Sequence, residues 1–141
     1  MPDELHFRIV TRRDLGPSDC PWFDPAHYRS DSGRDQVLLA YAGSECVSYA
    51  LFEEPGGYGS GDIELKYVEN APWHSRRGFA FRTIEELIRR FPDRLVWAVD
   101  VHPRAPILLR RAGFLSPDEV MRDHRGFRIG GAWVRLPSGR E

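Results

Sequence analysis

The sequence has little cysteine, almost no lysine and no long hydrophobic run. Its two cysteines, Cys20 and Cys46, stand far apart and form no CxxC pair. Two isolated thiols are too few for a structural zinc site or a disulfide framework, so we expect a reduced, cytoplasmic protein. No apolar run approaches the roughly 20 residues that span a bilayer, so no membrane partner is expected. Residues 1–4 are acidic and lack the apolar core of a secretory signal.

The charges of the chain almost cancel. Lys and Arg together number 20 and Asp and Glu number 21, which gives a formal net charge of -1. A general nucleic-acid binder usually carries a basic excess, so we do not expect a nucleic-acid partner. All of the Lys and Arg residues except Lys66 are arginines, a bias that codon usage explains as well as chemistry does.

Common catalytic and metal-binding patterns are also missing. No GxSxG motif occurs, and neither cysteine stands in a context that activates a covalent nucleophile. The histidines at positions 27, 74, 102 and 124 show neither HxH nor HxxxH spacing, so no metal site is predicted.

The sequence does contain the strand and helix patterns of a single domain. The 141 residues are 41% hydrophobic, which fits a single domain over residues 1–141. Apolar residues at helical spacing predict an amphipathic helix from Gly78 to Phe91, which Pro92 ends. A second helix is predicted over residues 105–112. Strands are predicted over residues 6–11, 36–41, 45–52, 62–69, 95–101, 119–123 and 132–136, which gives a mixed α/β fold.

The segment that enters the first helix has the features of an anion-binding loop. The first N–H groups of a helix have no intrahelical partner and lie at the positive end of its dipole. Gly78 lets a ligand approach the backbone, and Arg76 and Arg77 add positive charge. From spacing alone, residues 75–80 form either a phosphate-binding loop or an ordinary turn between a strand and a helix.

This segment and the order of the elements resemble the GNAT superfamily of acyl-CoA-dependent N-acyltransferases. The family signature [Q/R]-x-x-G-x-[G/A] corresponds to residues 75–80, where Gly78 and Ala80 match and Ser75 replaces the leading Gln or Arg. Pro72 stands at the proline that usually precedes the loop.

A second family block follows the predicted fifth strand. Ala105, Leu108 and the pair Gly113 and Phe114 fit it. His102 stands where the family commonly has Asn, and Leu109 stands where it commonly has a Tyr.

The resemblance implies a mixed, mostly antiparallel central sheet flanked by helices, with the fourth and fifth strands splayed apart. It implies acetyl-CoA as co-substrate, with the pantetheine arm in that gap, and no metal. The arm would pair with backbone at Val68, Glu69 and Asn70. The pyrophosphate would rest on the loop Ser75, Arg76, Arg77, Gly78, Phe79 and Ala80.

Transfer to an amine requires a base that takes the amine proton. Glu64 is the first candidate, because strand alternation places it with Lys66 on one face, opposite Ile63, Leu65 and Tyr67. A half-buried carboxylate there would have a raised pKa. Some histone-acetylating relatives carry their glutamate at a similar depth before the loop. Glu69 is the second candidate for the base.

The general acid is less clear from the sequence. In the family it is commonly the Tyr, and Leu109 has no proton to donate. His74 and His102 are candidate substitutes, and solvent can also protonate a coenzyme A thiolate.

Three interpretations therefore stand. The first is an acetyltransferase acting on a small-molecule or protein amine, with a homodimer as one possible assembly. The second is an acyl-CoA-binding sensor that has lost turnover. The third is an unrelated α/β domain. Trp22, Phe23 and Tyr28 would line the acceptor pocket of an enzyme or else belong to the core.

Overall fold

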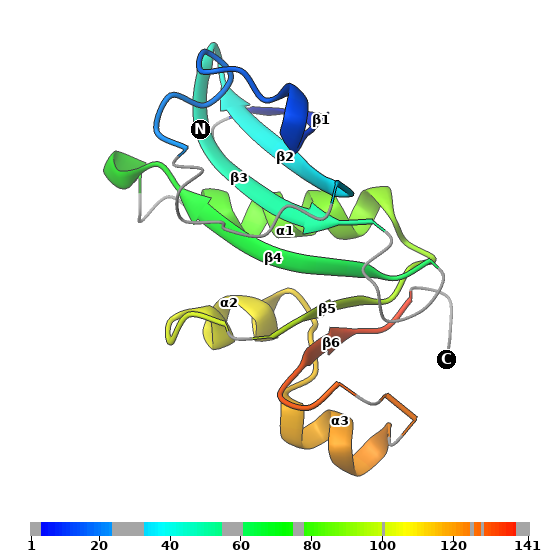
Figure 1. The fold of residues 1–141 in the computed structure, drawn as a ribbon. Helices are drawn as coiled ribbons and strands as arrows, with labels where there is room; N and C mark the ends of the chain where they lie inside the picture. The colour runs from blue at the N-terminus through cyan, green and yellow to red at the C-terminus, as the bar shows by residue number, and fades with distance from the viewer. Residues whose placement is uncertain are drawn as a thin grey trace.

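The computed structural model describes residues 4–23, 33–54, 61–74, 78–99, 101–124, 126–127 and 129–137. In these ranges six strands form one sheet in the sequential order β1 to β6 (Figure 1). Every neighbouring pair is antiparallel except β4 and β5, which are parallel. The strands are β1 (Leu5–Thr11), β2 (Asp35–Ala42), β3 (Glu45–Glu53), β4 (Ile63–Asn70), β5 (Val96–Ala98) and β6 (Trp133–Arg135).

The predicted mixed, mostly antiparallel sheet is therefore correct. The first four strands agree with their predicted ranges to within one residue at each end. Most side chains of β2 and β3 are buried, whereas those of β1 are half-buried or exposed.

Two helices cover one face of the sheet. They are α1 (Phe79–Arg90) and α2 (Ala105–Arg111), both close to their predicted ranges. Ile84 and Leu87 of α1 and Leu109 of α2 belong to one buried cluster with the inward residues of β2 to β5. Burial of this apolar stripe supplies most of the helix stability, because short helices are marginal on their own.

The opposite face is covered by residues 15–23, which follow the 3₁₀ turn η1 (Arg12–Asp14), and by α3 (Pro117–Asp123). Trp22 and Phe23 are half-buried and pack on Tyr49, with ring centroids 5.3 and 4.9 Å away. Both are thus part of the second core layer, and Tyr28 lies outside the described residues. None of the described helices is long and apolar enough to cross a membrane.

Residues 119–123, predicted as a strand, belong instead to the helix α3. The Ser116 hydroxyl accepts a hydrogen bond from Glu119 N at 3.2 Å, and the Glu119 carboxylate accepts one from Ser116 N at 2.9 Å. This reciprocal capping box satisfies two N–H groups at the helix start, and Pro117 suits its first turn. The strand prediction was wrong because it overlooked the Ser-Pro-x-Glu start signal.

The capping box gives a direct test of this helix. Replacing Ser116 by Ala is expected to lower the free energy of unfolding by about 1 kcal/mol, because the Glu119 N–H loses its acceptor. Urea unfolding measures the change. Ser44→Ala, in the exposed turn between β2 and β3, is the matched control and should leave the midpoint unchanged. Equal midpoints for the two variants would contradict the capping role.

Candidate functional site

The strands β4 and β5 separate soon after they meet. They pair only at Ile63 with Val96 and at Glu64 with Trp97, whereas β4 continues to Asn70. The fifth strand is consequently shorter than its predicted range, residues 95–101. Figure 1 shows β5 turning away from β4 toward α2. The predicted splay of strands four and five is thus present.

A narrow pocket of about 70 Å³ lies where the two strands have separated. Leu65 and Val68 of β4 form one side of it, and Ala98 and Val101 form the other. Because Val68 lies beyond the last β5 partner, the edge of β4 that faces this pocket is not paired with β5 there. The lining is completed by Lys66, Tyr67, His102, Ala105 and Leu109.

A β-bulge in β4 changes which residues share a face. Phe52 pairs with Leu65 but Leu51 pairs with Tyr67, so Lys66 is an extra residue in the strand. Tyr67 is consequently 37% exposed, whereas simple alternation predicted that it would share the buried face with Ile63 and Leu65. Val68 takes that place and packs against the main core cluster.

Glu64 stands at the fork, opposite Trp97 in the last pair between β4 and β5. Its other cross-strand neighbour is Glu53 of β3. Burial raises the pKa of the half-buried Glu64 carboxyl; Lys66 opposes this, while Glu53 and other nearby carboxylates add to it. No described side chain hydrogen-bonds to this carboxylate. The geometry therefore gives a carboxyl that accepts a proton more readily than an exposed glutamate.

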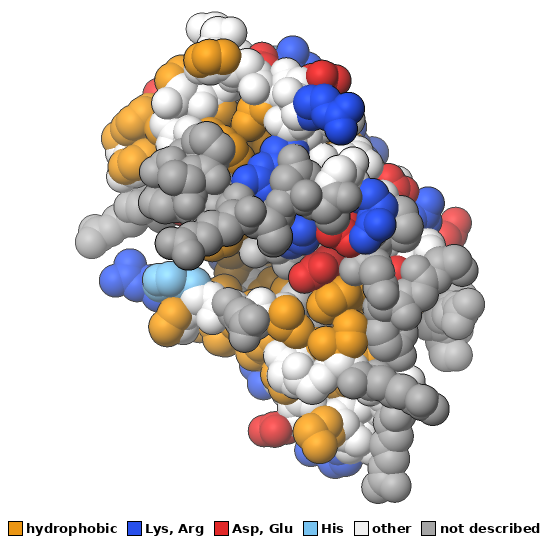
Figure 2. Space-filling model, viewed as in Figure 1, with side chains coloured by type: hydrophobic (Ala, Val, Ile, Leu, Met, Phe, Trp, Pro, Cys, Tyr) orange, Lys and Arg blue, Asp and Glu red, His pale blue; other side chains and the backbone are white. Residues whose placement is uncertain are grey.

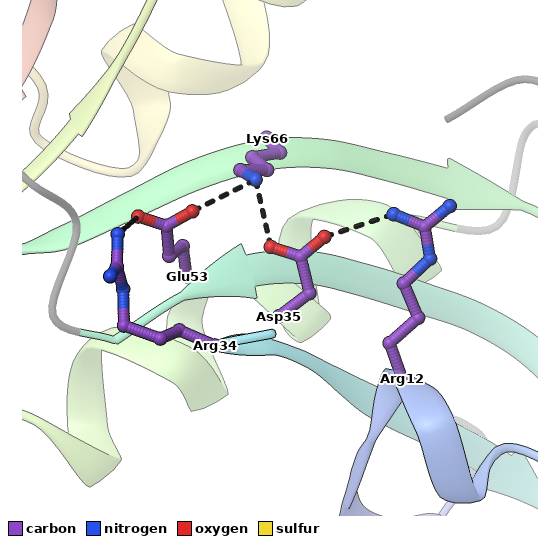
Figure 3. Close-up of polar contacts among 5 residues, drawn as sticks. All are labelled: Arg12, Arg34, Asp35, Glu53 and Lys66. Atoms are coloured by element: carbon purple, nitrogen blue, oxygen red, sulfur yellow. Dashed lines mark hydrogen bonds and ion pairs between the residues drawn. The ribbon is translucent and has the colours of Figure 1, made fainter. Parts of the chain in front are cut away.

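Beside Glu64 lies a buried network of charges that the sequence did not reveal (Figure 3). The Lys66 ammonium donates to Asp35 Oδ1 at 2.7 Å and contacts Glu53 Oε1 at 3.0 Å. Arg12 and Arg34 hold the outer oxygens of the same two carboxylates, each at 2.9 Å. Asp35 and Glu53 are only 2% and 5% exposed.

The network keeps Lys66 charged. Burial by itself lowers the pKa of this ammonium, but its hydrogen bonds to Asp35 and Glu53 outweigh burial and raise the pKa.

Figure 2, which shows the sheet face opposite α1, has acidic and basic side chains interspersed rather than a field of one sign. The only sequence signal for this network was the single lysine in a predicted strand.

Glu69 is fixed on the same face, nearer the end of β4. Its carboxylate accepts a hydrogen bond from the Tyr49 hydroxyl at 2.7 Å, and its carbonyl accepts one from the Ser48 hydroxyl at 2.8 Å. Tyr49 is fully buried. Glu69 therefore differs from Glu64, because one of its carboxylate oxygens already has a donor.

The predicted phosphate loop is described in part. Ser75, Arg76 and Arg77 lie outside the described residues. Gly78 begins α1 with φ of 74°, in the left-handed region that favours glycine, and a Cβ there would meet no described atom within 4 Å. Phe79 and Ala80 follow in the first turn and are buried. The start of α1 thus offers backbone N–H groups and space in front of Gly78.

Of the positions considered for the general acid, His102 and Leu109 line the pocket. His102 is exposed, and its Nδ1 accepts a hydrogen bond from Arg104 N at 3.1 Å. Leu109, at the position of the family Tyr, is 2% exposed and presents an apolar side chain to the same pocket. His74 belongs to the 3₁₀ turn η3 (Pro72–His74) that precedes α1.

The chain has the fold of the GNAT acetyltransferases. Among similar solved structures, Tetrahymena GCN5 has a TM-score of 0.65 at 9% identity, with 96% of this chain and 98% of that chain covered. The ribosomal-protein-S18-alanine N-acetyltransferase of Escherichia coli has a TM-score of 0.60 at 15% identity, with 80% and 79% covered.

A third similar structure contains a ligand. YhhK of Escherichia coli, a candidate N-acetyltransferase, was solved bound to coenzyme A; its TM-score is 0.59 at 14% identity, with 93% of this chain and 98% of that chain covered. No protein-family model matches the chain, and no curated protein matches its sequence. At these identities the likeness shows the fold alone.

Proposed function

We propose that the protein is an acetyl-CoA-dependent N-acetyltransferase that acts on a primary amine of a small molecule or a protein. The observation that carries the proposal is the fork between β4 and β5, with a half-buried glutamate at its base and a pocket beyond it. The fold likeness to acetyltransferases, including one bound to coenzyme A, supports the same conclusion.

In this proposal the pocket and the start of α1 bind the co-substrate. The backbone of Val68, Glu69 and Asn70, on the stretch of β4 beyond its last pair with β5, pairs with the pantetheine arm. The loop of residues 75–80 holds the pyrophosphate through its amides, with Arg76 and Arg77 adding positive charge. Acetyl-CoA supplies an acetyl group activated as a thioester, from which the coenzyme A thiolate is a good leaving group.

Glu64 then takes a proton from the acceptor, directly or through one water, so that a neutral amine attacks the acyl carbon. Its burial suits this role, because a base works best when its pKa lies closer to the working pH. Glu69 is less suited, because the Tyr49 hydroxyl already donates to its carboxylate.

We predict that no side chain is an essential general acid. Leu109 has no proton to give, and His102 uses Nδ1 to cap the backbone of Arg104. His74→Ala and His102→Ala should therefore each lower turnover less than tenfold, below the 10²–10⁴ that a positioned acid contributes. Steady-state kinetics with a confirmed acceptor measure this. A loss beyond a hundredfold, with coenzyme A affinity preserved, would make His102 the acid.

Gly78 tests the phosphate-binding loop. Gly78→Val is expected to weaken coenzyme A binding at least tenfold, because the side chain would project into the space that the phosphates need. Gly43→Val is the matched control: Gly43 also has a positive φ, of 62°, and open space, but lies in the turn between β2 and β3. Calorimetry with coenzyme A compares the variants. Equal affinities would reject the loop assignment.

The overall proposal is tested with acetyl-CoA and a panel of amines. We expect binding by calorimetry and release of free coenzyme A thiol that depends on the added amine. Leu109 favours one alternative, an acyl-CoA-binding sensor, and tight binding without transfer to any amine would support it. Absence of acetyl-CoA binding would reject both functions.

A further inference from the structure

The two cysteines of the chain lie in one buried cluster on the sheet face opposite α1. Cys46 belongs to β3, and Cys20 belongs to the segment of residues 15–23 that covers this face. Cys20 is 3% exposed and Cys46 is 4% exposed, and both are free thiols. The Cys46 thiol donates to the Ser48 carbonyl at 3.6 Å. The carbonyl of Asp19, next to Cys20, accepts a hydrogen bond at 2.7 Å from Tyr41, the cross-strand partner of Cys46. Two residues that are 26 positions apart in the sequence are thus brought into one buried cluster by the fold.

The backbone around both cysteines is held by local hydrogen bonds. The Trp22 indole N–H donates to the Cys46 carbonyl at 2.9 Å, and the Phe23 N–H donates to the Cys20 carbonyl at 3.0 Å. The cluster also contains Tyr49, on which both aromatic rings pack. These contacts hold Cys20 close to Cys46 in the packing between this segment and β3.

The two sulfurs are chemically unequal. Interaction with the Cys46 thiol lowers the pKa of the Cys20 thiol, although burial and the charge of Glu69 oppose this. Interaction with Cys20 and burial raise the pKa of the Cys46 thiol, with the nearby Asp19 charge adding to the rise. Because the thiolate is the nucleophile, these directions favour Cys20 as the first sulfur to react, in agreement with its place beside a surface pocket.

One side of Cys20 faces a surface pocket, although only 3% of the residue is exposed. Cys20 borders an open surface pocket of about 390 Å³. Cys46 is absent from the lining of this pocket, which agrees with a role as the second, resolving thiol. The other lining residues are Arg12, Leu15, Gly16, Pro17, Pro21 and Phe23.

We propose that Cys20 and Cys46 form a reversible disulfide when the protein meets a peroxide, and that this bond ties residues 15–23 to β3. The Cys20 thiolate attacks one peroxide oxygen, the O–O bond breaks, and the departing hydroxide takes a proton to give water. Cys20 is thereby oxidised to a sulfenic acid. The Cys46 sulfur then attacks that sulfur, and the Cys46 proton leaves with the hydroxyl group as a second water.

The disulfide would join residues 15–23 to β3, and Tyr49 links both of these parts to β4. Trp22 and Phe23 pack on Tyr49, and the Tyr49 hydroxyl donates to Glu69. A thiol reductant reverses the oxidation through a mixed disulfide, leaving both cysteines reduced and the reductant oxidised. Disulfide formation does not depend on the proposed acetyltransferase function, because it uses only the two thiols and the peroxide.

The experiment treats the full, reduced chain with a small excess of hydrogen peroxide and follows it by mass spectrometry. We expect the intact mass to fall by two hydrogen atoms. A peptide pair linked through Cys20 and Cys46 should be found after digestion, and dithiothreitol should reverse the change fully. Oxygen addition without a linked peptide, or disulfides between two copies of the chain, would overturn the proposal.

Single variants separate the roles of the two sulfurs. In Cys46→Ser, dimedone should trap a sulfenic acid on Cys20, and this should form at least tenfold faster than any oxidation of Cys46 in Cys20→Ser. Equal rates would overturn the assignment of Cys20 as the attacking thiol. Alkylation of the reduced wild-type chain by iodoacetamide gives the same comparison without a variant: Cys20 should be modified first, and modification of Cys46 first would contradict it.

Discussion

Replacing Glu64 by Gln is expected to lower turnover about 100-fold while acetyl-CoA affinity stays close to that of the wild type. The amide keeps the size and position of the side chain but cannot take the amine proton, and loss of a general base acts on the chemical step. Glu85→Gln, on the exposed side of α1, is the control and should leave turnover unchanged. Steady-state kinetics with a confirmed acceptor and calorimetry with acetyl-CoA provide the two measurements.

The pH dependence of the rate separates this role from a structural one. Burial raises the pKa of Glu64, and the Glu53 and Asp35 carboxylates add to the rise. A base acts only when deprotonated, so the wild-type rate should fall as the pH drops through that raised pKa. The Glu64→Gln profile should lack this acidic limb. An unchanged rate, or an unchanged acidic limb, would remove Glu64 from the mechanism.

Stability should move in the opposite direction to activity. Because the folded pKa of Glu64 lies above its unfolded value, the folded state holds the proton more tightly. Ionised Glu64 therefore costs stability once the pH has risen through the folded pKa. At pH 7 the neutral Gln should raise the melting temperature slightly, which thermal unfolding measures. A variant that loses turnover because it misfolds would show a lower melting temperature.

The parts of the fold that are set by residues close together in the chain could be predicted from the sequence. The strands β1 to β4 follow from residue-by-residue alternation, and α1 follows from its apolar stripe between Gly78 and Pro92. The helix α3 was equally local, because Ser116 and Glu119 carry its start signal, and it was missed because that signal was overlooked.

The parts that depend on strand register were not predictable. The bulge at Lys66 arises from how β4 pairs with β3, and it exposes Tyr67, which simple alternation places in the core. Asp35, Glu53 and Lys66 meet because three strands align, although Lys66 and Asp35 are 31 positions apart. Glu64 was identified from the sequence, but the charges that surround it are visible only in the fold.

This buried network should be costly to break. Lys66→Met is expected to lower the free energy of unfolding by about 3 kcal/mol, because Asp35 and Glu53 would lose the ammonium that lies between them. Urea unfolding at pH 7 measures the loss. The double variant Lys66→Met, Glu53→Gln removes one of the two buried carboxylates that lost the ammonium, and it should recover part of the lost stability. A loss below about 1 kcal/mol would show that Arg12 and Arg34 are sufficient partners.

The sign of the pH dependence follows from the raised pKa of Lys66. Its contribution to stability is complete below its unfolded pKa, about 10.4, and is lost only as the pH rises through the higher folded value. The difference between wild type and Lys66→Met should therefore be constant from pH 7 to about pH 9. Because the Lys66 charge also opposes the rise in the Glu64 pKa, the acidic limb of the rate profile should move to higher pH in this variant. A limb that stays in place would show that Lys66 holds the strands together without tuning the base.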